Sequence, residues 1–131
     1  MRRLIAACAV VALVSVAPQA VAVPRSKQCR DRSVVRTVRC AGRHYGGRSL
    51  VRTALRIGRC ESGLALREAP HSDPYHGQYQ YLASTFASEQ DAMPAVVNGM
   101  DLSDEVHNMR ANVVTAVAWM SKHGTGPWSC A

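Results

Sequence analysis

Apolar residues recur every three or four positions in the middle of the chain, which predicts an amphipathic helix. Its expected buried stripe consists of Leu50, Ala54 and Ile57. Its expected solvated stripe consists of Arg48, Arg52, Arg56 and Arg59. Ser49 is a good N-cap and Gly63 is a typical residue beyond a helix end, so we expect this helix over about 49–62.

The same periodicity near the end of the chain predicts a second long helix. The apolar residues of its core stripe are Val106, Met109, Val113, Val117 and Met120. We expect it to begin near Ser103, with two acidic residues in its first turn, and to end near Lys122, just before Gly124. A shorter helix is expected over about 85–91, capped by Ser84. We expect Pro94 and Gly99 to interrupt helical structure in the segment between these two helices.

Two other segments have no helical period. The glycine-interrupted, arginine-rich segment 23–48 is expected to be a loop or a short helix. Residues 63–83 are rich in Gly, Pro, His, Asp and Tyr, which favours a loop or a short β-hairpin. The fold class is therefore expected to be mainly α, with a small β wing.

The first 22 residues have the organisation of an export signal. Two arginines precede an apolar run, Leu4–Ala17, that is short for a membrane span, and Ala20-Val21-Ala22 supplies a small-x-small cleavage site. We expect secretion to the cell wall region, with the mature chain starting at Val23. A lipoprotein modified at Cys8 and an uncleaved anchor are the alternatives.

Cleavage there would leave an even number of cysteines in a small exported chain, which indicates two disulfides. The four residues are Cys29, Cys40, Cys60 and Cys130. Three connectivities are possible; the local one joins Cys29 to Cys40 and would leave Cys60 and Cys130 to each other. A zinc site is the alternative, but no two of these cysteines have the C-x-x-C spacing.

The length of 131 residues and the composition exclude a multidomain enzyme, a multi-span membrane protein and a repeat solenoid. The net charge is +7. The charge is unevenly distributed. Residues 23–60 hold eleven basic side chains and one acid, whereas residues 61–131 hold three basic side chains and eight acids. Such a basic region suits an anionic polymer of the wall or an acidic lipid, or is simply a solvated surface. Nucleic acid is the least expected partner because the chain is exported.

Glu61 is the first candidate for chemistry. It follows Ile57 by four positions and therefore continues the apolar stripe of its helix, in the last turn. Burial and the negative end of the helix dipole both disfavour the ionised carboxylate there, and a general acid needs a retained proton. The alternative is a carboxylate that pairs with an arginine at the helix end.

Aromatic and amide side chains follow Glu61 within 20 residues: Tyr75, Gln78, Tyr79, Gln80 and Tyr81. Tyrosine rings pack against the apolar faces of sugars while their hydroxyls bond to sugar oxygens, so this group is typical of a carbohydrate cleft. The alternative is that the tyrosines are the packing face of a hairpin.

Four motifs in order resemble the transglycosylase-like domain of resuscitation-promoting factors, a family of secreted proteins with a small lysozyme-like fold that cleave peptidoglycan. They are Cys60-Glu61-Ser62-Gly63, His76-Gly77-Gln78-Tyr79-Gln80, Leu82-Ala83-Ser84-Thr85-Phe86 and Gly124-Thr125-Gly126-Pro127-Trp128-Ser129-Cys130. The resemblance covers about residues 49–130, which would be the catalytic domain (49–131) behind the basic segment 23–48.

The resemblance implies roles for individual residues. The family's catalytic glutamate falls on Glu61, the glutamine of its Gly-x-x-Gln block on Gln80, its Ser/Thr pair on Ser84 and Thr85, and its disulfide on Cys60–Cys130. The chain departs from the family at Phe86, where tryptophan is usual, at Gly77-Gln78-Tyr79, where the family has Gly-Gly-Leu, and after Gly63, where its Asn-Trp is missing.

The implied reaction is cleavage of the β-1,4 bond between N-acetylmuramic acid and N-acetylglucosamine, with Glu61 protonating the leaving oxygen. A hydrolase needs a second carboxylate, for which Asp73 is the candidate, although Asp73-Pro74 is also typical of a turn. A lytic transglycosylase uses one glutamate as acid and then base. The rival hypotheses are a wall-binding module of the same fold and a cationic antimicrobial or inhibitor protein.

We expect the protein to act as a monomer on peptidoglycan strands, without a cofactor or a bound metal ion. Its basic N-terminal segment could add contacts to anionic wall polymers. His71 and His76 lie five positions apart in an expected loop. Two histidines are too few ligands for a metal site, so we expect both to be solvated loop residues.

Overall fold

A computed structural model describes residues 28–64 and 74–131 of the chain. The expected signal peptide, residues 23–27 of the basic segment, His71 and Asp73 lie outside the described residues. The described residues form five helices and one antiparallel pair of strands. In chain order these are α1 (Val34–Tyr45), α2 (Gly47–Ser62), β1 (Tyr75–His76), β2 (Tyr81–Leu82), α3 (Ala83–Asp91), α4 (Pro94–Met100) and α5 (Met109–His123). The expectation of a mainly helical protein with a small β wing is confirmed.

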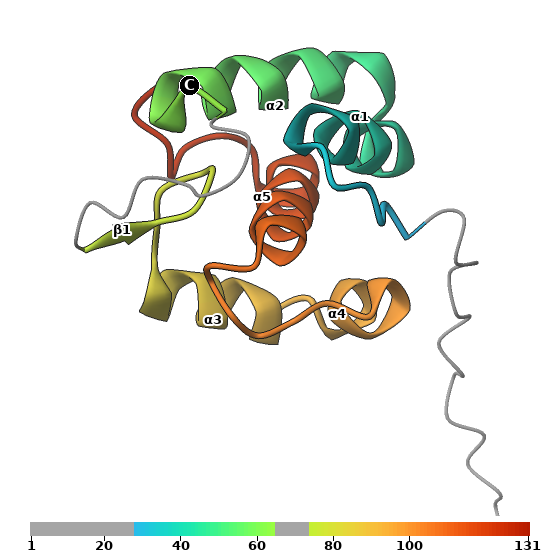
Figure 1. Cartoon of the computed structure of the whole chain (residues 1–131), viewed down its shortest axis with the longest axis vertical. Helices are drawn as coiled ribbons and strands as arrows, with labels where there is room; N and C mark the ends of the chain where they lie inside the picture. Colours follow the sequence, from blue (N-terminus) through green and yellow to red (C-terminus); the bar gives the residue numbers. More distant parts are fainter. Residues whose placement is uncertain (1–27, 65–73) are drawn as a thin grey trace, which may run out of the picture.

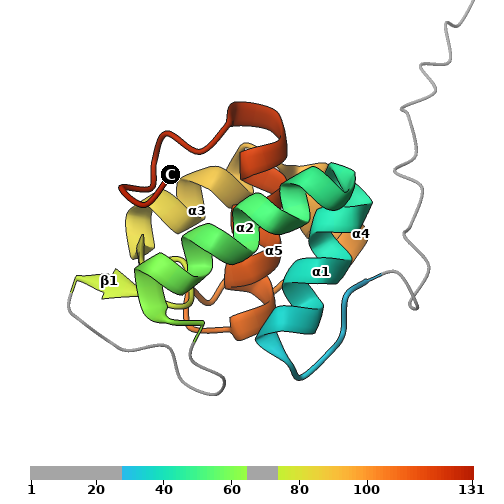
Figure 2. The ribbon, with the colours of Figure 1, turned by 90° about the horizontal axis from the view of Figure 1, so that it is seen from above.

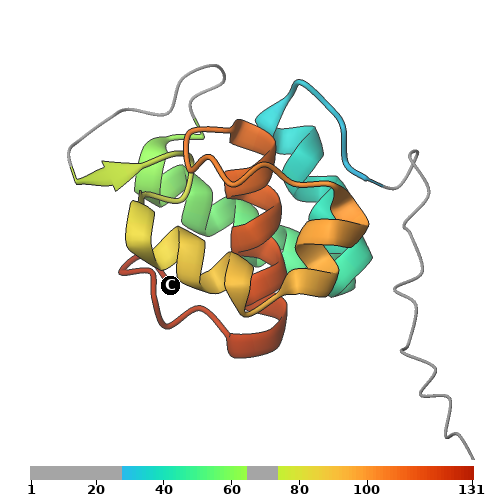
Figure 3. The ribbon, with the colours of Figure 1, turned by 90° about the horizontal axis from the view of Figure 1, so that it is seen from below.

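The helices are arranged around α5, which runs through the middle of the molecule (Figure 1). Helices α1 and α2 lie across one side of α5, as Figure 2 shows, and α3 and α4 cover the other side, as Figure 3 shows. This position explains why nine of the fifteen residues of α5 are buried. The sequence is consistent with such a helix, because small and β-branched residues occupy nearly every turn of it.

The arginine-rich segment forms the twelve-residue helix α1 and joins the same core as α2 and α5. Val34, Val38 and Ala41 are fully buried, on the side opposite to the arginines of α1. The local disulfide Cys29–Cys40 is present and ties the chain before α1 to its middle.

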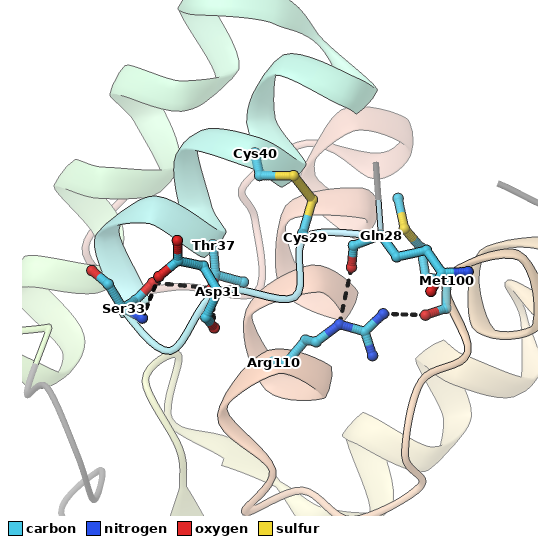
Figure 4. The surroundings of a disulfide bond; sticks show 8 residues. All are labelled: Gln28, Cys29, Asp31, Ser33, Thr37, Cys40, Met100 and Arg110. Atoms are coloured by element: carbon cyan, nitrogen blue, oxygen red, sulfur yellow. Dashed lines mark hydrogen bonds between the residues drawn. A yellow bond between two sulfur atoms is a disulfide. The ribbon is translucent and has the colours of Figure 1, made fainter. Parts of the chain in front are cut away.

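Arg110 of α5 fastens this N-terminal region to the rest of the fold (Figure 4). Its Nε donates to the carbonyl of Gln28 at 3.0 Å, and its terminal nitrogens donate to the carbonyls of Met100 and Asp101. Because the five N–H groups of a guanidinium form a rigid fork, one side chain can hold two chain segments that are distant in sequence.

Helix α2 ends as the sequence predicts but begins earlier. Gly63 is its C-cap, with φ +69°. The backbone N–H of Gly63 donates to the carbonyl of Arg59, the bond of the αL motif, and the N–H of Leu64 donates to the carbonyl of Gly58. Ser49 is not its N-cap: the helix begins at Gly47, and no side chain caps it. The chain reverses between α1 and α2 at Gly47, whose φ of +73° suits glycine, so the helix starts directly after this turn.

Two expectations for the shorter helices are wrong. Ser84 does not cap α3, because β2 leads straight into the helix and Ser84 lies within its first turn. Gly99 does not interrupt helical structure either, whereas Pro94 does stand at a break, because α3 ends at Asp91. Pro94 begins α4, where the N–H that proline lacks has no helical partner to lose, and Gly99 is buried inside the helix.

Helix α5 begins six residues later than expected. Ser103 instead accepts a bond from the backbone of Glu105 in a local turn. Asn108 is the N-cap, and its side chain accepts a 3.0 Å bond from the N–H of Ala111. The end of the helix is close to the expected one, at His123 with Gly124 beyond it.

The second disulfide, Cys60–Cys130, joins the end of α2 to the C-terminal tail. Both cysteine pairs thus follow one of the three connectivities that the sequence left open. Among the described residues, no helix has both the length and the apolar character needed to span a membrane.

Candidate functional site

One cleft of about 470 Å³ lies where the end of α2, the hairpin, the start of α3 and the C-terminal tail meet. Its lining residues are Glu61, Tyr75, Tyr79, Gln80, Tyr81, Leu82, Thr85, Pro127, Trp128 and Ser129. The cleft thus brings together Glu61, Tyr75, Tyr79, Gln80, Tyr81 and Thr85, as the sequence predicts. Gln78, which belongs to the same predicted group, is buried and is not among the lining residues. The tail residues and Leu82 are additional.

Glu61 is the penultimate residue of α2, next to Cys60 and its disulfide. Its side chain is half-buried, and its Oε1 is buried with no hydrogen-bond partner among residues 28–64 and 74–131. Within these described residues, Glu61 also forms no ion pair with an arginine. A carboxyl oxygen in this situation is available to a group that enters the cleft.

The backbone around Glu61 is held from two sides. The disulfide ties the preceding residue to the tail, and the hydroxyl of the following residue, Ser62, donates to the carbonyl of Gln78 at 2.8 Å. Since Gln78 belongs to the hairpin turn, this bond ties the end of α2 to the hairpin. A fixed carboxyl is a requirement for directed proton transfer.

The hairpin turn is built on an unusual backbone and a buried amide. Tyr75 pairs with Leu82 and His76 with Tyr81, and the turn between them has φ +78° at Gly77 and φ +50° at Gln80. Asn112 of α5 is fully buried beneath this turn. Its Oδ1 accepts from the N–H of Tyr79 at 3.1 Å, and its Nδ2 donates to the carbonyl of His76 at 3.3 Å.

Gln80 is half-buried at the end of this turn. Its Nε2 donates to the carbonyl of Gly77 at 2.8 Å, which fixes the orientation of the amide. Thr85, also half-buried, lies in the first turn of α3 on the neighbouring wall. Both side chains carry polar groups that suit the hydroxyl and amide groups of a sugar.

The three tyrosines of the cleft differ in solvent exposure and in the partners of their hydroxyl groups. Tyr75 is 47% exposed, so its ring is open to a ligand. Tyr79 and Tyr81 are buried, and their hydroxyls donate to the carbonyl of Ala54 and to a carboxylate oxygen of Glu89. These two hydroxyls therefore have protein acceptors, and the rings contribute packing to the cleft wall. For these two residues, the alternative that the tyrosines form the packing face of the hairpin is the correct one.

Trp128 completes this wall from the C-terminal tail. It is buried, its indole Nε1 donates to the carbonyl of Tyr79 at 3.0 Å, and its ring lies edge-on to Tyr79 and Tyr81 at 6.1 and 6.0 Å. The sequence marked this residue only as part of a resemblance. Its proximity in sequence to Cys130 is the feature that could have placed it here.

A second carboxyl, that of Glu89, lies behind the wall. It is 3% exposed and accepts its bond from Tyr81. Burial raises the pKa of Glu89 to about 7, and the hydrogen bond from Tyr81 opposes part of this effect. The same burial and the neighbouring carboxylate raise the pKa of Tyr81 well above 10. Nothing in the sequence distinguished Glu89 from an exposed helix residue.

No group of three or more His, Cys, Asp or Glu side chains is placed to hold a metal ion within the described ranges. His76 and His107 are in edge-to-face contact, with ring centroids 4.7 Å apart. The cleft offers a carboxyl, an amide, a hydroxyl and aromatic surface, which is the chemistry of acid catalysis on a neutral polyhydroxylated ligand.

Comparison with known proteins adds no relative: no family model, curated protein or solved structure matches the chain.

Proposed function

We propose that the protein is an exported, lysozyme-like glycosidase that cleaves the β-1,4 bond between N-acetylmuramic acid and N-acetylglucosamine in peptidoglycan. The observation that carries the proposal is the placement of Glu61. Its carboxyl lines the cleft, and one of its oxygens is buried without a protein partner among the described residues. The order of the motifs, which resembles resuscitation-promoting factors, supplies the substrate class.

In this proposal Glu61 donates its proton to the glycosidic oxygen as the bond to the muramic acid carbon breaks. Tyr75 provides an open aromatic face for a sugar ring, and Gln80 and Thr85 bond to its substituents. The buried wall of Tyr79, Tyr81 and Trp128 limits the depth to which the strand enters.

The lining of the cleft favours the one-carboxyl route. Glu61 is the acidic residue among its described lining residues, and Glu89 lies behind Tyr81. After giving up its proton, Glu61 can take the proton of the muramic 6-hydroxyl, which then attacks the anomeric carbon and closes a 1,6-anhydro ring. A muramidase would instead need a second carboxylate near the bond, for which Asp73 stays the candidate.

Digestion of purified peptidoglycan by the oxidised mature protein tests the proposal, with mass spectrometry of the released muropeptides. Products that are lighter by one water at the muramic end identify the transglycosylase route. Ordinary reducing ends identify a muramidase. Absence of products from a folded wild-type protein would contradict the enzyme proposal.

The arginines on the outer faces of α1 and α2 favour a second candidate, a wall-binding module of the same fold. In that case Glu61→Gln leaves function intact, whereas neutralising arginines within 23–59 removes it. Wall binding and cleavage, measured on the same two variants, separate the candidates.

A further inference from the structure

Four arginines form a continuous stripe on α2. Arg48, Arg52, Arg56 and Arg59 are all exposed. At 100° per residue, their spacing of four, four and three positions keeps them within about a quarter of the helix circumference. At a rise of 1.5 Å per residue, the stripe extends about 16 Å along the axis.

The stripe reaches the C-terminal tail, which forms one wall of the cleft. Its last two members, Arg56 and Arg59, lie on the opposite face of α2 from Glu61, because five and two positions turn the helix by about 140° and 200°. The link to the cleft therefore runs through the tail. A terminal nitrogen of Arg56 donates to the carbonyl of Cys130 at 3.4 Å, and the preceding residue, Ser129, lines the cleft. A polymer that leaves the cleft across the tail reaches Arg56 first and then the rest of the stripe.

No carboxylate of residues 28–64 and 74–131 pairs with an arginine of the stripe. The ion pairs of the described residues join Arg30 to Asp101 and Arg36 to Asp31, and neither pair includes a stripe residue. Guanidinium groups have a planar fork of donors that matches a carboxylate with two parallel bonds. Repetition of this group along an axis suits a linear ligand that carries negative charges at intervals.

We propose that the arginine stripe of α2 binds the carboxylate groups on the peptides of the same glycan strand that occupies the cleft. This inference rests on the proposed function, because it takes the strand to be peptidoglycan, whose peptides are acidic. Arg56 contacts the tail that lines the cleft, so a strand that crosses the tail brings its own anions to the stripe. The cleft then supplies the chemistry and the stripe supplies affinity for charged wall.

Binding to insoluble peptidoglycan tests the inference apart from cleavage. The mature oxidised protein with Glu61→Gln is pelleted with the wall, and the bound fraction is measured over a range of salt. Arg48→Gln, Arg52→Gln and Arg59→Gln are added together, whereas Arg56 is kept for its bond to the tail. The control removes the same charge from exposed residues of the α1 region, through Arg32→Gln, Arg39→Gln and Arg43→Gln.

The expected result is wall binding about tenfold weaker for the α2 variant, since three exposed charge contacts are lost, and less than about threefold weaker for the control. The difference disappears on wall whose carboxyl groups have been converted to amides, and persists on wall stripped of phosphate polymers. If the triple variant does not fold, Arg52→Gln is compared with Arg39→Gln.

Equal loss in the α2 and α1 variants would overturn the inference, because binding would then follow net charge alone. Disappearance of the difference on phosphate-stripped wall would also overturn it, in favour of a separate anionic polymer. The expected binding pattern together with a wild-type protein that releases no products would support the stripe and contradict the proposed cleavage.

Discussion

At the scale of single residues, the cleft divides side chains of the same type into different roles. Tyr75 is open to a ligand, whereas Tyr79 is fully buried with its hydroxyl bonded to Ala54 at 2.9 Å. Tyr75→Phe should leave the free energy of unfolding unchanged, and Tyr79→Phe should lower it by about 1 kcal/mol, the contribution of one buried hydrogen bond. Chemical denaturation of the two variants checks this. Equal stability of both would mean that the bond of Tyr79 contributes nothing.

Glu89 makes stability depend on pH. Its pKa of about 7 in the folded protein lies above the ordinary value of 4.5, so between these values the folded state holds a proton that the unfolded state has lost. Stability from this group is therefore fully present below about pH 4.5 and is lost as the pH rises through about 7. The total change is on the order of 3 kcal/mol.

The matched variant is Glu89→Gln, which keeps an acceptor for the Tyr81 hydroxyl and removes the titration. We expect it to unfold at a higher temperature than wild type at pH 8, and the difference should vanish near pH 4. Thermal unfolding followed by circular dichroism over this range measures both. A parallel pH dependence in the variant would assign the effect to another group.

At the scale of elements, the hairpin turn depends on a glycine packed against α5. A Cβ on Gly77 would lie 2.0 Å from Nδ2 of Asn112, and its φ is +78°. Gly77→Ala should therefore lower the free energy of unfolding by about 3 kcal/mol or more, through overpacking and backbone strain together.

Gly63 provides the control for this substitution. Its φ of +69° is similar, but a Cβ there would meet no atom of the described residues within 4 Å. Gly63→Ala should cost only about 1 kcal/mol, the strain of a left-handed residue. Denaturant titration of the two variants compares them, and equal costs would show that contact with Asn112 is unimportant.

The elements also show how far the sequence predicts the fold. Hydrophobic spacing located α2, because one face of it packs against the core, and the body of α5, although α5 is buried on more than the predicted face. The starts of the helices were wrong at Ser49, Ser84 and Ser103, where turns and strands that depend on tertiary contacts decide which residue begins the helix. Propensity for a cap is local information, and these starts are not set locally.

The candidate site, too, could be predicted from the sequence only in part. Its six members could be nominated because short motifs along the chain carry them, and all six line the cleft. The burial of Tyr81 and its bond to Glu89 could not be predicted, since they depend on how α3 packs behind the hairpin. Trp128 joins the site through a disulfide that spans 70 positions.

At the scale of the whole molecule, the two disulfides constrain the chain to different extents. Cys29–Cys40 closes 11 positions, and Cys60–Cys130 closes 70 and holds the tail against the cleft. In the chain-entropy model these closures are worth about 3 and about 4 kcal/mol.

Replacing both cysteines of one pair with serine separates these contributions. Loss of Cys60–Cys130 should cost more stability than loss of Cys29–Cys40 and should also reduce glycan cleavage, because Ser129 and Trp128 belong to the cleft. Loss of Cys29–Cys40 should reduce stability with activity retained below the unfolding temperature. Activity assays beside thermal unfolding distinguish the two. Equal activity of the two variants would contradict a role of the tail in the cleft.

The most direct test of the account is a time course of peptidoglycan digestion by wild type and Glu61→Gln, with thermal unfolding of both to show that they are folded. The account predicts soluble muropeptides from wild type and a rate lower by at least about a hundredfold for the variant, the contribution typical of a general acid. Equal release by both proteins would show that Glu61 is not the acid and would contradict the central claim.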